Sequence, residues 1–136
     1  MTQISGSKTE DILPGVTPAA RKRLLGDLLR GVSRTFYLTL GILPAGLREP
    51  VGLAYLLARA ADTIADTTLV SPGQRLEHLL SFRDQVTGPA RLEPLRQIEL
   101  ALTDKQSIPQ ERDLLTSLPA AFSMLEASPE PDRALI

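Results

Sequence analysis

The segment VGLAYLLARAADTIADT, residues 51–67, decides the fold class. Its leucines and small residues recur every three or four positions, which is the spacing of one face of an α-helix. At about 100° per residue, the polar side chains share an arc of about 60° on the opposite side: Tyr55, Arg59, Asp62 and Asp66. A helix that is apolar or small on three sides is expected to be largely buried, so we expect its polar stripe to face an internal cavity.

Helical signals continue through the rest of the chain. Prolines stand at positions typical of helix starts, as in Thr17-Pro18 and in Ser71-Pro72, where Gln74 completes a capping-box pattern. The predicted helices cover residues 17–30, 34–43, 50–67, 72–86, 91–103 and 109–127, the last kinked at Pro119. The helix over residues 72–86 is expected to bury Leu76, Leu79, Leu80 and Val86. No segment alternates like a β-strand, so the predicted class is all-α.

Composition restricts the chemistry of this chain. Its 136 residues are enough for one domain with a core, and 43% hydrophobic and 23% charged residues are typical of a globular protein. A net charge of -1 gives little attraction for nucleic acid. The absence of cysteine excludes disulfides and thiolate catalysis, and a single histidine, His78, disfavours a Ser-His-Asp triad or a His-rich zinc site. Carboxylates, arginines and hydroxyls are therefore the candidate groups.

The two ends of the chain suggest its organisation. The first fifteen residues are polar and lack the apolar core of a signal peptide, and the most apolar stretch, residues 38–61, is interrupted by prolines and charges. We expect a cytoplasmic protein with a flexible tail over residues 1–16 and one partial domain over residues 17–136. Ser128-Pro129-Glu130 resembles a helix start close to the last residue, which suggests a fragment whose next helix is cut. A short flexible tail is the alternative.

Asp62 and Asp66 are the first candidate site. They are four residues apart on the predicted helix, so their carboxylates lie on one face and repel each other. A Mg²⁺ ion would remove that repulsion, because it prefers one or two carboxylates together with water and phosphate oxygens. Arg59, one turn earlier, would reach the same phosphate or clamp Asp62. The alternative is a solvated face with an Arg59–Asp62 ion pair.

The run Ser33-Arg34-Thr35-Phe36-Tyr37 is the second candidate site. It offers two hydroxyls, a guanidinium and the backbone N–H groups of a helix start, all suited to a diphosphate. The alternative is a serine N-cap with Arg34 in solvent. The run Arg21-Lys22-Arg23 is interpreted as a solvated face, with contact to anionic lipid or phosphate as the alternative.

Together, these two sites carry a resemblance to a known family. The segment VSRTFYLTLGILPAGLREPVGLAYLLARAADTIADT, residues 32–67, resembles the squalene/phytoene synthase family in the order and spacing of S-R-T-F, L-P-x-x-L-R and A-Y-x-x-x-R-A-x-D-T-x-x-D. The resemblance implies the helical isoprenoid synthase fold. Members of the family are longer and carry a second aspartate-rich motif, whereas no D-x-x-x-D follows Asp66 here. We therefore expect the N-terminal portion only, truncated after the first half of the fold.

The resemblance also implies roles for the matching residues. Asp62 and Asp66 match the aspartates that hold Mg²⁺, and Arg34 and Arg59 match basic residues that neutralise the substrate diphosphate. The pocket beside the diphosphate is matched by Ser33, Thr35, Phe36 and Tyr55. The implied reaction is the head-to-head condensation of two prenyl diphosphates, with farnesyl diphosphate expected as the substrate and NADPH as the reductant if squalene is formed.

Two other interpretations stay open on the sequence. One is a non-catalytic fragment that binds Mg²⁺ and diphosphate weakly, because the second aspartate-rich motif is missing. The other is a helical interaction module whose leucine faces pack on a partner. The expected partners are a prenyl diphosphate and a second copy of the chain, bound through exposed apolar helix faces. Because the products are lipids, we also expect peripheral contact with a membrane. No nucleic-acid partner is expected.

Overall fold

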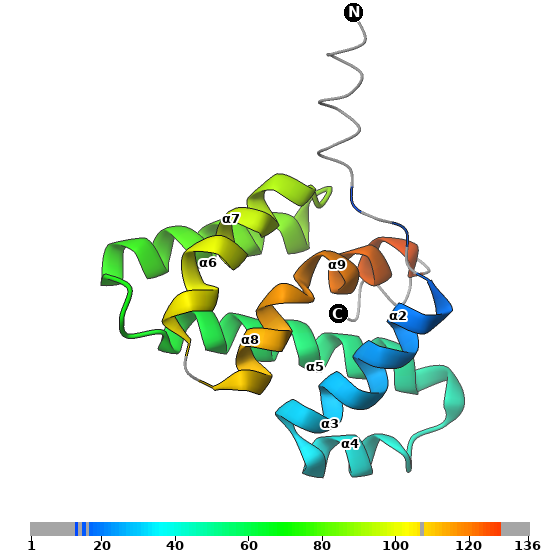
Figure 1. Cartoon of the computed structure of the whole chain (residues 1–136). Coiled ribbons are helices and arrows are strands. Elements are labelled where there is room, and N and C mark those ends of the chain that lie inside the picture. The colour runs from blue at the N-terminus through cyan, green and yellow to red at the C-terminus, as the bar shows by residue number, and fades with distance from the viewer. Residues whose placement is uncertain (1–12, 14, 16, 107, 129–136) are drawn as a thin grey trace, which may run out of the picture.

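The computed structural model describes residues 13, 15, 17–106 and 108–128 (Figure 1). The helical elements in chain order are α2 (Pro18–Arg23), η1 (Leu24–Leu28), α3 (Leu29–Val32), α4 (Arg34–Leu40), α5 (Ala45–Asp66), α6 (Pro72–Thr87), α7 (Leu92–Leu102), η2 (Thr103–Lys105), α8 (Pro109–Thr116) and α9 (Leu118–Ala127). The described residues contain no strand, so the predicted all-α class is confirmed.

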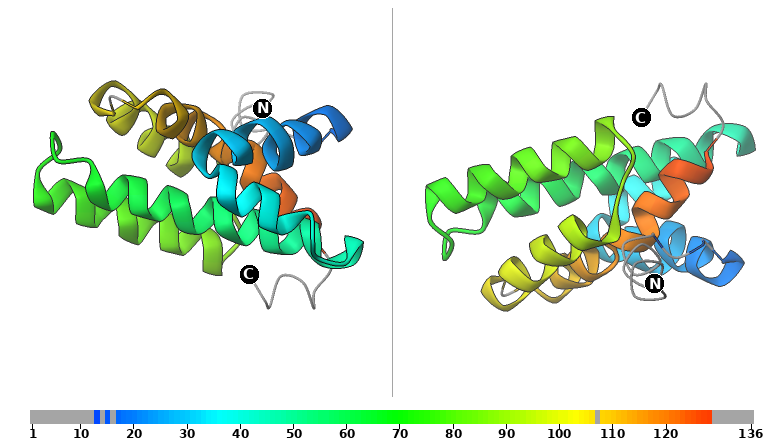
Figure 2. Two further views of the ribbon diagram at one scale, coloured as in Figure 1. Left: turned by 90° about the horizontal axis from the view of Figure 1, so that it is seen from below. Right: turned by 90° about the horizontal axis from the view of Figure 1, so that it is seen from above.

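The long helix α5 is the centre of the packing. It contacts η1, α4, α6, α8 and α9. Figure 2 shows α5 and α6 side by side as one layer; α8 and α9 pack on α5, and α7 contacts α6, α8 and α9. The apolar face predicted for α5 is confirmed, because its apolar members are all buried: Leu53, Leu56, Leu57, Ala60 and Ile64.

The helix predicted over residues 17–30 runs on through α2, η1 and α3 to Val32. Thr17 caps it by accepting a hydrogen bond from the backbone N–H of Ala20 at 3.0 Å. The middle section, Leu24–Leu28, is a π-helical turn, which hydrophobic spacing does not reveal. Its buried leucines are Leu24, Leu28 and Leu29.

The turn between α4 and α5 differs from the prediction. Helix α4 ends at Leu40 instead of residue 43, and α5 begins at Ala45 instead of residue 50. Pro50 removes only the backbone hydrogen bond to the residue four positions earlier, so the helix can start before it. Arg48 closes the turn by donating from Nε to the carbonyl of Leu43 at 2.9 Å and from Nη2 to that of Gly41 at 3.2 Å.

Helix α6 begins with the predicted capping box of Ser71 and Gln74. Its predicted burial is wrong at two positions, because Leu76 is 56% exposed and Leu80 is 41% exposed, whereas Leu79 and Val86 are half-buried. Helical spacing marks an apolar face but does not say whether a neighbour covers it. Among the described elements, α6 packs mainly on α5 and α7.

The last predicted helix is broken in two. Helix α8 ends at Thr116 and α9 begins at Leu118, so the kink predicted at Pro119 lies at Ser117. Proline at the second position of α9 cannot donate to the preceding turn, which separates the two helices. Ser117 Oγ donates to the carbonyl of Asp113 at 2.7 Å and accepts from Arg23 Nη2 at 2.6 Å, which fixes the break against α2.

Two predictions concern segments that lie largely outside the described residues. These are the flexible tail over residues 1–16, of which only residues 13 and 15 are described, and the helix start at residues 128–130, of which only Ser128 is described. Within the described ranges, every helix is too short or too polar to cross a membrane.

Candidate active site

The two candidate motifs lie on neighbouring helices, α4 and α5. Ser33 has an extended backbone with φ -159°, and its Oγ accepts a hydrogen bond from the N–H of Phe36 at 3.1 Å, which starts α4. Phe36 then stacks on Tyr55 of α5, with ring centroids 4.1 Å apart and planes 13° from parallel. The stack places the first turn of α4 beside the middle of α5. The N-cap interpretation of Ser33 is therefore the observed one.

Arg34 and Thr35 stand in the first turn of α4 with exposed side chains. Arg34 makes no ion pair or hydrogen bond with any residue that the structure describes. The N–H donors of its guanidinium are therefore available to a ligand that approaches from solvent.

Asp62 and Asp66 are both exposed on the last two turns of α5. The prediction that this stripe faces an internal cavity is wrong for Asp62 and Asp66, which are exposed in the described structure, whereas Tyr55 and Arg59 are half-buried against α4 and α8. The predicted Arg59–Asp62 clamp is absent as well. Neither carboxylate forms an ion pair within residues 17–106 and 108–128, so both keep their oxygens available to a cation.

Arg59 is paired with a residue that the sequence analysis did not single out. Its Nη2 lies 3.0 Å from Oε1 of Glu111 in α8. Glu111 is only 5% exposed, and the same oxygen accepts a hydrogen bond from Thr63 Oγ1 at 2.8 Å. Arg59 and Thr63 lie one turn apart on α5, so Glu111 binds this helix at two points.

Glu111 had one signal in the sequence. It stands three, four and seven residues before buried leucines, and so shares their face of the helix: Leu114, Leu115 and Leu118. An acidic side chain on a buried face needs a partner. This pattern could have identified Glu111 as a residue that needs a partner. It could not have identified Arg59 or Thr63 as the partner, because both lie far from Glu111 along the chain.

Three buried polar atoms around these helices have no hydrogen-bond partner in the described structure. They are Arg59 Nε, Glu111 Oε2 and Thr103 Oγ1. Unpaired buried polar atoms are uncommon in folded proteins, because each loses its hydrogen bonds to water. The Arg59–Glu111 pair is thus only partly satisfied by its neighbours.

The donors on the exposed stripe fit a Mg²⁺ ion in one particular way. Asp62 and Asp66 supply hard carboxylate oxygens one turn apart, and neither is engaged elsewhere among the described residues. Among the described residues, no three acidic, histidine or cysteine side chains lie close enough together to hold a metal ion. An ion there would therefore take most of its ligands from water and phosphate oxygens, which is the usual mode for Mg²⁺.

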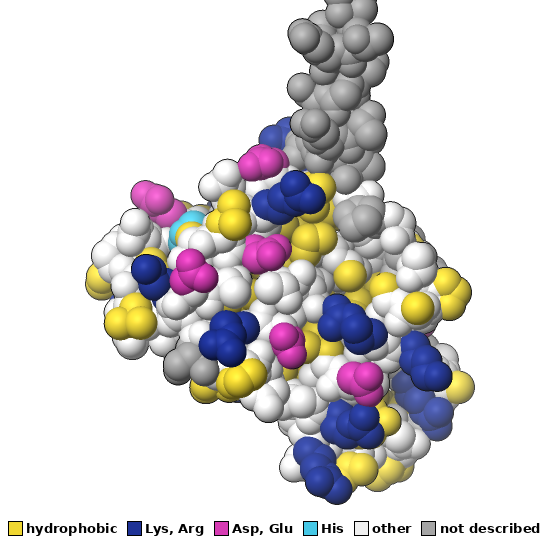
Figure 3. Space-filling view, in the orientation of Figure 1, with side chains coloured by type: hydrophobic (Ala, Val, Ile, Leu, Met, Phe, Trp, Pro, Cys, Tyr) yellow, Lys and Arg dark blue, Asp and Glu magenta, His cyan; other side chains and the backbone are white. Residues whose placement is uncertain are grey.

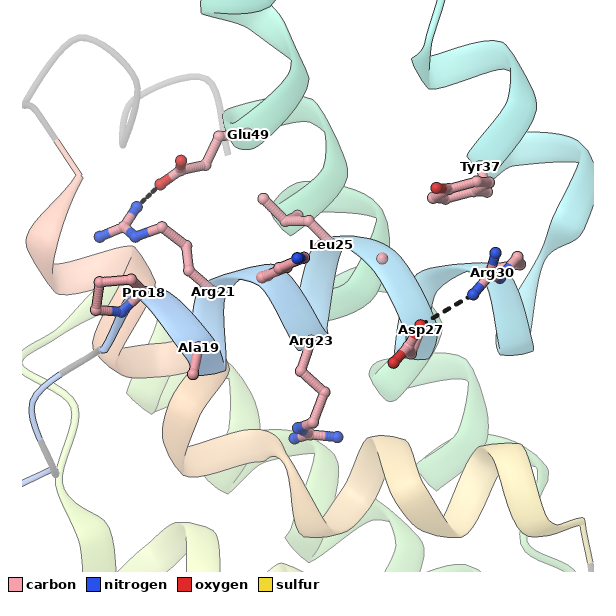
Figure 4. Close-up of a pocket in the computed structure, with 11 residues that line it drawn as sticks. Pro18, Ala19, Arg21, Arg23, Leu25, Asp27, Arg30, Tyr37 and Glu49 are labelled. Carbon is pink, nitrogen blue, oxygen red and sulfur yellow. Dashed lines mark hydrogen bonds and ion pairs between the residues drawn. The ribbon is translucent and has the colours of Figure 1, made fainter.

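A separate basic pocket of about 700 Å³ lies along α2 and η1 (Figure 4). Figure 3 shows Lys and Arg side chains gathered over this side of the molecule, with acidic ones between them. Arg21 is paired with Glu49, and Arg30 lies 2.9 Å from Asp27 and 5.4 Å from the Tyr37 ring centroid. These cations are already neutralised by their own neighbours. Its lining includes Tyr37 of the second candidate site and the run Arg21-Lys22-Arg23, but none of the residues matched to the metal or the diphosphate.

Comparison with known proteins gives the following matches. The family model described as squalene/phytoene synthase matches residues 29–135. A squalene synthase of Solanum lycopersicum is 39% identical over 59 residues, which are 43% of this chain and 14% of that protein. A squalene synthase of Nicotiana benthamiana is 39% identical over 60 residues, 44% of this chain and 15% of that protein. The squalene synthase BSS of Botryococcus braunii is 34% identical over 61 residues, 45% of this chain and 13% of that protein.

The matched region includes every predicted site residue and Glu111. The chain aligns with only 14% of the length of the tomato relative. No solved structure matches.

Proposed function

Because this chain belongs to the squalene/phytoene synthase family, we propose that it carries the part of a prenyltransferase that binds Mg²⁺ and the substrate diphosphate. The observation that supports this most is the Phe36–Tyr55 stack, with ring centroids 4.1 Å apart. It brings the exposed Arg34 of α4 to the helix that carries Asp62 and Asp66. A guanidinium and two unpaired carboxylates on adjoining helices suit a magnesium diphosphate.

Each group has a proposed role in substrate binding. Asp62 and Asp66 would hold Mg²⁺, which would supply positive charge to stabilise the leaving diphosphate. Arg34 binds oxygens of the diphosphate from α4. Arg59 lies on α5, one turn before Asp62. Phe36 and Tyr55 form an apolar wall that keeps water from the first carbons of the prenyl chain.

The proposed reaction joins two farnesyl diphosphates head to head. The C1–O bond of one substrate breaks, and its electron pair leaves with the diphosphate. The allylic cation takes the π electrons of the C2–C3 double bond of the second chain, and loss of a proton closes a cyclopropane ring. Loss of the second diphosphate with its electron pair, opening of the ring and transfer of a hydride from NADPH to the resulting cation would lead to squalene. We expect a cytoplasmic protein in peripheral contact with membrane.

A direct assay tests this proposal. The chain is incubated with labelled farnesyl diphosphate and Mg²⁺, with and without NADPH, and extracted hydrocarbon and released diphosphate are counted. We expect Asp62→Asn to abolish Mg²⁺-dependent binding and any turnover. Asp104→Asn, an exposed aspartate in η2, is the matched control and should change neither.

The outcomes separate the alternatives. Turnover that disappears in Asp62→Asn supports a complete enzyme. Diphosphate binding that needs Mg²⁺ and Asp62 but gives no hydrocarbon supports a binding fragment without catalysis. If the native chain binds no diphosphate in the presence of Mg²⁺, the proposed function is wrong.

A second candidate function rests on exposed apolar side chains. Leu76 and Leu80, four residues apart on one face of α6, are 56% and 41% exposed, and exposed apolar side chains that lie together mark interaction surfaces. This supports the helical interaction module, with a second copy of the chain as the partner.

A further inference from the structure

The two arginines assigned to the diphosphate are in different electrostatic states. Arg34 is exposed and makes no ion pair with the described residues. Arg59 is paired at 3.0 Å with Glu111, and its side chain is 35% exposed. A guanidinium beside a fixed carboxylate attracts an anion much less than a free one, since the two charges largely cancel at a distance.

Glu111 is held firmly in this position. It is 5% exposed, and Thr63 Oγ1 donates to the same Oε1 atom that pairs with Arg59, at 2.8 Å. The carboxylate therefore has no route to solvent that keeps these contacts. An approaching diphosphate meets Arg59 with its countercharge already in place.

The acidic residues decide the net charge of the proposed diphosphate site. Asp62, Asp66 and Glu111 contribute three negative charges, whereas Arg34 and Arg59 contribute two positive ones. The five charged side chains of the site together carry a net negative charge, which repels a free diphosphate. The site becomes attractive only when a divalent cation binds to the aspartates.

We infer that Glu111 makes diphosphate binding at this site depend on a divalent cation. By neutralising Arg59, it lets the site take the metal complex of a diphosphate and reject the free anion. This inference rests on the proposed function, because it concerns the same diphosphate site. It assigns Glu111 a role in ligand selection, carried out through Arg59 and without contact to the substrate.

The test compares inorganic diphosphate binding with and without Mg²⁺ by isothermal titration calorimetry. Glu111→Gln keeps an oxygen that can accept from Arg59 and Thr63 but removes the charge. We expect its metal-free affinity to rise about tenfold above that of the native chain, and its affinity with Mg²⁺ to change much less. The ratio of the two affinities should therefore fall.

Two variants serve as controls. Asp113→Asn removes an exposed carboxylate from the same helix and should leave the ratio unchanged. Arg59→Ala combined with Glu111→Gln should lose the metal-free gain, because the freed guanidinium is then missing. A purely structural role of Glu111 would weaken binding equally under both conditions.

The outcomes are distinct from those of the proposed function. If Glu111→Gln binds metal-free diphosphate no better than the native chain, the inference is overturned. If the native chain fails to bind diphosphate with Mg²⁺, the proposed function fails and the inference fails with it, whereas native binding with Mg²⁺ and no metal-free gain in Glu111→Gln overturns the inference alone. If circular dichroism shows Glu111→Gln to be unfolded, Glu111→Asp replaces it. Its shorter side chain draws the charge away from Arg59, and a smaller gain of the same sign is expected.

Discussion

Thr63 joins the buried carboxylate of α8 to the central helix. Its hydroxyl donates to Glu111 Oε1 at 2.8 Å, and its side chain is buried. Thr63→Val keeps the shape and removes the donor, so Glu111 loses one of its two partners. Because a hydrogen bond to a charged group contributes about 1.5–3 kcal/mol, we expect the free energy of unfolding to fall by that amount in urea titrations.

Thr39→Val is the matched control for this change. Thr39 Oγ1 donates at 2.9 Å to the carbonyl of Thr35 on an exposed part of α4, where water can replace it. The control should cost less than about 0.5 kcal/mol. Equal losses in the two variants would mean that Glu111 does not depend on the hydroxyl of Thr63.

Among elements, the close approach of α5 to its neighbours depends on Gly52. A Cβ atom at this position would lie 2.9 Å from Leu25 Cδ2 and 3.1 Å from Leu40 Cδ2. Gly52→Ala should therefore force the side chains of Leu25 and Leu40 to shift or α5 to move away from η1 and α4, and we expect it to destabilise the protein by about 1 kcal/mol or more in thermal unfolding.

Gly46→Ala, in the same helix, provides the comparison. No atom lies within 4 Å of the Cβ that it would add, so only helix propensity changes. We expect a gain of about 0.5–1 kcal/mol. If Gly52→Ala also stabilised the protein, the leucines would have room to move and the packing argument would fail.

Local patterns were enough to predict the course of most helices. The period of the leucines indicated the buried face of α5, and the Ser71–Gln74 capping box marked the start of α6. Both depend on residues within one or two turns of each other. The π-helical turn at Leu24–Leu28 and the early start of α5 at Ala45 depend on packing and backbone bonding, which the same periodicity does not contain.

The candidate site could be predicted only in part. The two motifs lie on the neighbouring helices α4 and α5, which follow each other directly within residues 32–67. Arg59 was expected to serve Asp62 or a phosphate, but it pairs with Glu111, which is 52 residues away along the chain. Choosing between carboxylates at such separations requires the tertiary structure.

At the scale of the whole molecule, exposed leucines on α6 are the notable surface feature. Leu76 and Leu80 are four residues apart and lie on one face. We expect the native chain to self-associate through this face, with an apparent mass that rises with concentration in light scattering. Leu76→Glu with Leu80→Glu should shift it towards monomer, because burial of the charges is unfavourable.

Leu47→Glu is the control for this experiment. Leu47 is comparably exposed, but it lies near the start of α5, at the turn that follows α4. It should leave the association intact if the α6 face is the contact. A native chain that stays monomeric over a wide range of concentration would contradict the expectation.

The hydrogen bond between Arg23 and Ser117 has a consequence for the timing of folding. It joins positions 94 residues apart. At roughly 5–20 residues per second, a ribosome needs about 5–20 s to add the missing stretch. During that interval the leucine-containing elements η1 and α3 lack α8, on which they pack. A nascent chain paused in this window would present a leucine-rich helix to chaperones, and slower translation would lengthen its dependence on them.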